Sequence, residues 1–77
     1  MEKKLSELVS GEKGGIVRIV ADGKIRRRLF DMGVTPGAGI VMPKRAPLGD
    51  PLEVTVRGYE LTLRKSEADC VVVDVDA

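Results

Sequence analysis

The chain contains no histidine and no tryptophan, and it has one cysteine among its 77 residues. Histidine is the commonest general base and metal ligand, so its absence removes every Cys-His and Ser-His catalytic pair. The single cysteine, Cys70, cannot form an internal disulfide, which fits a reducing cytosol. Cys70 opens a valine-rich segment, and we interpret it as a small buried hydrophobic residue. These absences predict that the protein is not an enzyme.

Long apolar runs are also missing. No stretch approaches the roughly 18 apolar residues of a membrane-spanning helix, and the N-terminus has no apolar core of a signal peptide. The sequence therefore predicts a cytoplasmic protein with no direct membrane insertion. A net charge of +1 and only two aromatic residues, Phe30 and Tyr59, argue against nucleic-acid binding. The short chain, which begins with Met, is expected to form one domain over residues 1–77.

A β-hairpin is the clearest element. Apolar and polar residues alternate from Leu52 to Arg57 and again from Tyr59 to Arg64, on either side of Gly58. A two-residue loop at Arg57-Gly58 would pair Leu52 with Leu63, Val54 with Leu61 and Val56 with Tyr59. All six apolar residues then lie on one face, which we expect to face the core.

The remaining segments are short. We expect a helical turn at 5–9, a helix at 24–32, a capped turn at 66–69 and further strands at 16–20, 39–44 and 70–75. The total is five short strands, one helix and two helical turns. Because no helix separates consecutive strands from the second onward, the sheet should be mostly antiparallel. The fold class is therefore mainly β, a small five-stranded barrel.

The helix carries a run of three arginines. Ile25, Leu29 and Met32 form one apolar stripe, and Asp22 and Gly33 are the expected N-cap and C′ residues. The arginines lie mostly off the stripe, and Phe30 is expected to be partly exposed; the run is Arg26, Arg27 and Arg28. Two interpretations stay open: a solvated helix face, or a patch that faces an acidic protein surface.

The connection between the second strand and the hairpin holds an isolated apolar residue. Leu48 lies between Pro47 and Gly49 in a polar loop. Binding residues concentrate on loops held by a rigid scaffold, so Leu48 is a candidate contact for a partner. The alternative is that Leu48 folds back and closes one end of the barrel.

No motif for metal binding is present: there is no CxxC, no His pair and no EF-hand loop. Asp74 and Asp76 share a strand face, and we interpret them as a solvated strand end. A metal-binding or metal-sensing role would have to use carboxylates such as Asp50 and Glu53, or Cys70. Its ligands are unknown from the sequence.

Several motifs together resemble a known family. They are Leu5-x-x-Leu8, Arg27-Arg28-Leu29, Met32-Gly33, Thr35-Pro36-Gly37, Pro47-Leu48-Gly49-Asp50-Pro51 and Val56-Arg57-Gly58-Tyr59. On these residues the sequence resembles the FeoA family, small cytosolic companions of the ferrous-iron transporter FeoB. The resemblance covers roughly residues 5 to 73.

The resemblance implies an SH3-like barrel and a non-enzymatic, regulatory role in ferrous-iron transport. It implies binding to the cytosolic, GTPase-bearing portion of a FeoB-type transporter, with no certain cofactor. The predicted partner contacts are Arg26, Arg27, Phe30, Pro47 and Leu48, and the predicted structural turns contain Gly33 and Gly58. The alternative is a transition-metal-binding or metal-sensing module with weak affinity for a divalent ion such as Fe2+. Oligomeric state is not specified.

Overall fold

The computed structural model describes residues 1–43 and 51–76. Its elements in chain order are β1 (Glu2–Lys4), the 3-10 helix η1 (Leu5–Glu7), β2 (Lys13–Ile19), α1 (Gly23–Asp31), β3 (Gly39–Val41), β4 (Leu52–Val56), β5 (Tyr59–Leu63), α2 (Lys65–Ala68) and β6 (Val71–Val75). The strands form one antiparallel sheet in the order β1-β6-β2-β3-β4-β5. No helix in the described ranges is long and apolar enough to span a membrane.

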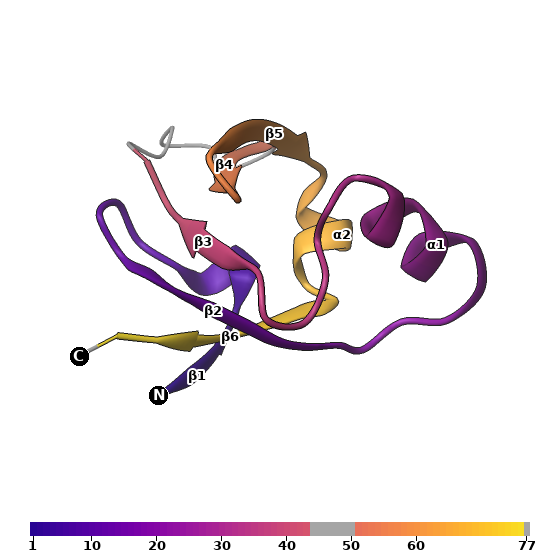
Figure 1. Ribbon diagram of the computed structural model, residues 1–77, viewed down its shortest axis with the longest axis horizontal. Coiled ribbons are helices and arrows are strands. Elements are labelled where there is room, and N and C mark those ends of the chain that lie inside the picture. Colours follow the sequence, from indigo (N-terminus) through magenta and orange to yellow (C-terminus); the bar gives the residue numbers. More distant parts are fainter. Residues whose placement is uncertain (44–50, 77) are drawn as a thin grey trace.

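The sheet is strongly curved. In Figure 1, β1, β6 and β2 lie along the lower side, β4 and β5 lie along the upper side, and β3 connects the two. The helix α1 stands at one end of the longest axis, and both chain termini lie toward the other. The core fills the concave side and consists of buried aliphatic residues, including Leu5, Leu8, Ile40, Met42, Leu63 and Val73. The helical turn expected at 5–9 is present as η1, and both Leu5 and Leu8 are buried in this core.

The hairpin has the predicted register. Leu52 pairs with Leu63, Val54 with Leu61 and Val56 with Tyr59. The prediction that all six apolar side chains face the core is wrong at one position, because Tyr59 is 73% exposed. Tyr59 lies beside the turn on β5, an edge strand of the sheet, and the core does not extend far enough to cover it. Leu61, further along β5, is half-buried.

Within the described residues the sheet has six strands rather than five. The additional strand is β1, which pairs antiparallel with β6 although its sequence, Glu-Lys-Lys, has no alternation to indicate a strand. The strand β2 also begins three residues earlier than expected and includes Gly14 and Gly15. Gly14 lies so close to β6 that a Cβ there would clash with the carbonyl oxygen of Asp74. A glycine in this strand therefore permits close approach of two backbones.

The turn before β6 is capped differently from the expectation. The sequence suggested Ser66 with Asp69, whereas α2 begins one residue earlier and Glu67 supplies the cap. The backbone N–H of Arg64 donates to Oε1 of Glu67 at 3.0 Å. Cys70, expected to be buried, is half-buried at the margin of the core, with its Sγ 3.5 Å from the carbonyl oxygen of Ser66.

Candidate partner-binding surface

The helix α1 contacts the body of the protein through few of its side chains. Leu29 is its one fully buried residue, and Met32, just beyond its end, packs partly against the core. The expected apolar stripe fails at Ile25, which is 43% exposed. Ile25 lies in the first turn of α1, and only the second half of the helix rests on the core. Most of the helix surface is thus open to solvent.

The sequence defines both ends of α1. Asp22 occupies the predicted N-cap position, but its side chain makes no capping hydrogen bond. At the other end the N–H of Val34 donates to the carbonyl oxygen of Leu29 at 2.9 Å, and that of Gly33 to Phe30 at 3.0 Å. These two bonds form a Schellman motif, with Gly33 at a φ of +90°. The helix therefore has a fixed length and a fixed exit direction.

Polar contacts hold α1 and the residues that follow it against three other segments. Nε of Arg28 lies 2.8 Å from Oε2 of Glu67, whose side chain is only 9% exposed. Nη1 of Arg26 donates to the carbonyl oxygen of Ile19 at 3.2 Å. From the hairpin turn, Arg57 donates to the hydroxyl of Thr35 at 2.9 Å and to the carbonyl oxygen of Gly33 at 3.4 Å. These contacts orient the helix without covering its outer face.

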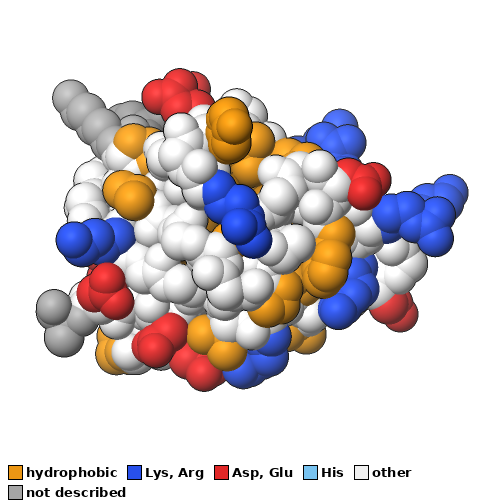
Figure 2. All heavy atoms as spheres, in the orientation of Figure 1, with side chains coloured by type: hydrophobic (Ala, Val, Ile, Leu, Met, Phe, Trp, Pro, Cys, Tyr) orange, Lys and Arg blue, Asp and Glu red, His pale blue; other side chains and the backbone are white. Residues whose placement is uncertain are grey.

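The outer face of α1 combines positive charge with an aromatic ring. The guanidinium carbon of Arg26 lies 4.8 Å from the ring centroid of Phe30, which is cation–π geometry. Phe30 is 38% exposed, in agreement with the expectation of partial exposure. A shallow hollow of about 370 Å³ lies here, lined by Gly23, Arg26, Arg27, Phe30 and Asp31. Figure 2 shows Lys and Arg side chains gathering at this end of the molecule.

We call the surface formed by Arg26, Arg27 and Phe30 the α1 face. It unites the three helix residues that the sequence singled out as partner contacts. The other two, Pro47 and Leu48, lie outside the described residues. The α1 face offers a cation fixed over an aromatic ring, a second exposed cation and a shallow hollow. Such a surface suits an acidic protein surface with some apolar content.

Two residues of this region were not predicted. Arg57 connects the hairpin turn to the segment that follows α1, Glu67 connects α2 to α1, and both connections join segments more than 20 residues apart. Arg57 has a φ of +52°, which is unusual for a residue other than glycine. The one sequence signal for Arg57 is its place beside Gly58 in a two-residue turn.

Metal-ligating side chains do not gather in the described part of the chain. No group of three or more Cys, Asp and Glu residues there is placed to hold an ion. Of the carboxylates and thiol considered as ligands, Glu53 lies exposed on β4 and Cys70 faces a backbone carbonyl. Asp50 lies outside the described residues.

Known proteins match nearly the whole chain. The family model described as "FeoA domain" matches residues 3–75. A Porphyromonas gingivalis protein named "Fe(2+) transport protein A/Fe(2+) transporter FeoB fusion protein" is 35% identical over 72 residues, which is 94% of this chain. The chain spans only 8% of the length of that relative.

Two solved structures share the fold. A crystal structure of an iron uptake regulatory protein (FeoA) matches with a TM-score of 0.90 and 34% identity, over 99% of this chain and all of that one. Stenotrophomonas maltophilia FeoA, described as an SH3 domain protein complexed with zinc, matches with a TM-score of 0.78 and 36% identity. That match covers 96% of this chain and 89% of the other. The expected mainly β, SH3-like fold is confirmed.

Proposed function

Because the chain belongs to the FeoA family, we propose that it is a non-enzymatic accessory protein of ferrous-iron transport. The fusion relative supports this proposal, since its name joins a FeoA part and a FeoB transporter in one polypeptide. Two proteins that act together are often found as one chain in another organism. In this proposal, residues 1–77 form one FeoA-like domain that works in the cytoplasm.

The partner in this proposal is the cytosolic, GTPase-bearing portion of a FeoB-type transporter. We choose the α1 face as the contact surface because the guanidinium of Arg26 stacks on the ring of Phe30. A guanidinium already ordered over a ring loses little conformational entropy on binding, so the pair is suited to anchor an interface. Arg27, exposed beside the stack, adds a second positive charge for an acidic partner surface.

The experiment is a binding titration between this protein and the purified cytosolic portion of the FeoB-type transporter from the same genome. Arg27→Glu should weaken binding roughly tenfold and Phe30→Ala by a similar factor, as expected for residues near the centre of an interface. Lys4→Glu is the matched control, because Lys4 is an exposed cation on β1, away from α1. Wild-type affinity in both α1 variants, or no binding at all by the wild type, would refute this part of the proposal.

A metal-binding module is the second candidate. It is favoured by one observation, that the S. maltophilia relative is described in complex with zinc. Anaerobic titration with Fe2+ and with Zn2+ tests it directly by calorimetry. Saturable binding with defined stoichiometry, lost in a Cys70→Ala or Glu53→Gln variant, would identify those side chains as ligands. Heats no larger than those of dilution would count against metal binding. Partner binding would then be the one proposed role.

A further inference from the structure

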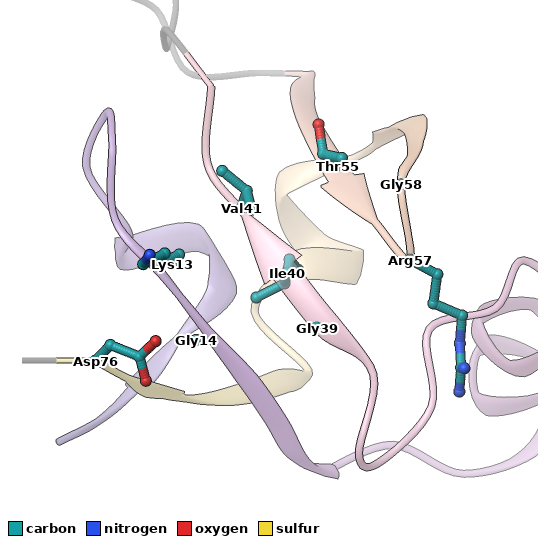
Figure 3. Close-up of a pocket in the computed structure, with 9 residues that line it drawn as sticks. All are labelled: Lys13, Gly14, Gly39, Ile40, Val41, Thr55, Arg57, Gly58 and Asp76. Carbon is teal, nitrogen blue, oxygen red and sulfur yellow. The ribbon is translucent and has the colours of Figure 1, made fainter.

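A second hollow lies on the convex side of the sheet, at a distance from the outer surface of α1. It has a volume of about 370 Å³, and its lining comes from β2, β3 and the β4–β5 hairpin, together with Asp76. Figure 3 shows Lys13 and Asp76 on one side of β3 and Arg57 on the other. We call this hollow the sheet groove. The sheet groove takes no part in the function proposed above.

Glycines form the floor of the sheet groove. Gly39 lines the groove on β3, and its partner on β2, Gly15, lies beside that lining, so the two neighbouring strands both lack a side chain at this level. A Cβ built on either glycine would meet no atom within 4 Å, which shows that the space above them is open. In Figure 2 the surface over β2 and β3 is mostly white, the colour of backbone and polar side chains without charge. A chain that lies here would contact the backbone directly.

An apolar wall stands beside this floor. Val41 on β3 pairs with Lys13 on one side and with Thr55 on the other, so these three residues form one row across the sheet. Val41 is 44% exposed, although it lies on a central strand of the sheet. Three strands about 4.8 Å apart span roughly 10 Å, which is the length of about three residues of extended chain. The groove therefore fits a short extended segment that carries an apolar side chain.

The two ends of the sheet groove differ in charge. At one end Lys13 and Asp76 bring one positive and one negative charge to the lining, whereas Arg57 at the other end has no ion-pair partner within residues 1–43 and 51–76. Its bonds to Thr35 and Gly33 use Nε and Nη2 and fix the guanidinium in place. Arg57 is also held at a positive φ, where glycine or asparagine would be less strained. A guanidinium ordered in this way, with no ion-pair partner in the described part of the chain, is suited to bind a carboxylate.

We propose that the sheet groove binds an extended acidic segment of a protein partner. An apolar side chain of the segment would pack over Gly39 against Val41, and a carboxylate would pair with Arg57. The charge difference between the two ends sets the direction of the segment. This surface is additional to the α1 face, and its test requires no transporter.

The test is an NMR titration of the ¹⁵N-labelled protein with the capped peptide Ac-Ala-Glu-Val-Leu-Ala-NH2. Saturable shifts are expected at the amides of Gly14, Gly39, Thr55 and Gly58. The same peptide with Gln in place of Glu should bind roughly fivefold more weakly, the factor expected for one exposed ion pair. Higher salt should reduce this difference, because it screens the pair.

Two variants complete the test. Gly39→Val fills the groove and should abolish the shifts without loss of stability, since the space is open and valine favours strands. Thr62→Val, on the exposed face of β5 outside the groove, is the matched control and should bind as the wild type does. The proposal is overturned if no groove amide shifts saturably, if the Gln peptide binds equally well, or if Gly39→Val binds like the wild type.

Discussion

The carboxylate of Glu67 binds two segments at once: one oxygen accepts the backbone N–H of Arg64, and the other lies 2.8 Å from Nε of Arg28. The first contact caps α2, and the second holds α1 against α2. Because the side chain of Glu67 is only 9% exposed, its charge is largely removed from water and depends on these two partners.

Replacing Glu67 should therefore lower the free energy of unfolding by more than the loss of an ordinary helix cap does. We expect Glu67→Ala to lower the free energy of unfolding by about 2–3 kcal/mol, from a lost cap and a lost charge-assisted contact. Glu7 is a matched control, since its carboxylate accepts the N–H of Lys4 at 2.9 Å on an exposed surface. Glu7→Ala should cost about 0.5–1 kcal/mol in urea unfolding. Equal losses in the two variants would show that the contact with Arg28 adds nothing.

Substitutions at Arg57 should separate backbone strain from side-chain bonding. Arg57→Gly relieves the positive φ but loses the bonds to Thr35 and Gly33, so its net change should stay within about 1 kcal/mol. Arg57→Val loses the same bonds and adds a β-branched side chain at that φ, and should cost more than about 2 kcal/mol. Thermal or urea unfolding measures both. A glycine variant as unstable as the valine variant would contradict the strain argument.

Glu12 should give the protein a measurable pH dependence. The N–H of Val9 and, to a lesser extent, Lys3 lower the pKa of Glu12 below its ordinary value of 4.5. A carboxylate with a lowered pKa in the folded state contributes stability that is complete above the unfolded pKa and lost as pH falls through the folded pKa. The Glu12→Gln variant should therefore show a flatter loss of stability below about pH 4.5. Parallel curves for variant and wild type would assign the acid sensitivity to other carboxylates.

The two ends of strand β5 differ in burial, and this difference can be tested by mutation. Leu63 is fully buried, whereas Tyr59 on the same face of β5 is 73% exposed. Leu63→Ala should cost about 2–5 kcal/mol as a buried cavity, and Tyr59→Ala should cost about 1 kcal/mol or less. Denaturant unfolding of the two variants measures the difference. A large loss at Tyr59 would mean that its ring is covered in solution.

Local pattern made part of this fold predictable. The alternation around Gly58 determined the hairpin register, because a shift by one residue would expose the whole apolar face. The sequence also indicated both ends of α1: Asp22 stands at the N-cap position, and Gly33 ends the helix through hydrogen bonds to its own neighbours in the chain. These features depend on residues that are close in sequence.

Long-range contacts made the rest unpredictable. Glu2–Lys4 becomes a strand because β6 offers it an edge, and nothing in its own composition requires one. The exposure of Ile25 and Tyr59 depends on where the core ends, which no periodicity reports. The same holds for the α1 face: the sequence identified Arg26, Arg27 and Phe30, but the contacts of Arg28 and Arg57 that orient the helix join distant segments.

The placement of the chain termini has a consequence for proteins in which such a domain is joined to another. The N-terminal ammonium lies 2.7 Å from the Asp74 carboxylate, so the first residue lies beside the end of β6, toward the end of the 30 Å long axis opposite α1. A domain attached through a linker at either end would rotate about that linker, and α1 would lie at the side farthest from the attachment point. The order in which the two domains are fused would then have little effect on where α1 lies. The length of the linker would set the effective concentration of α1 near its target.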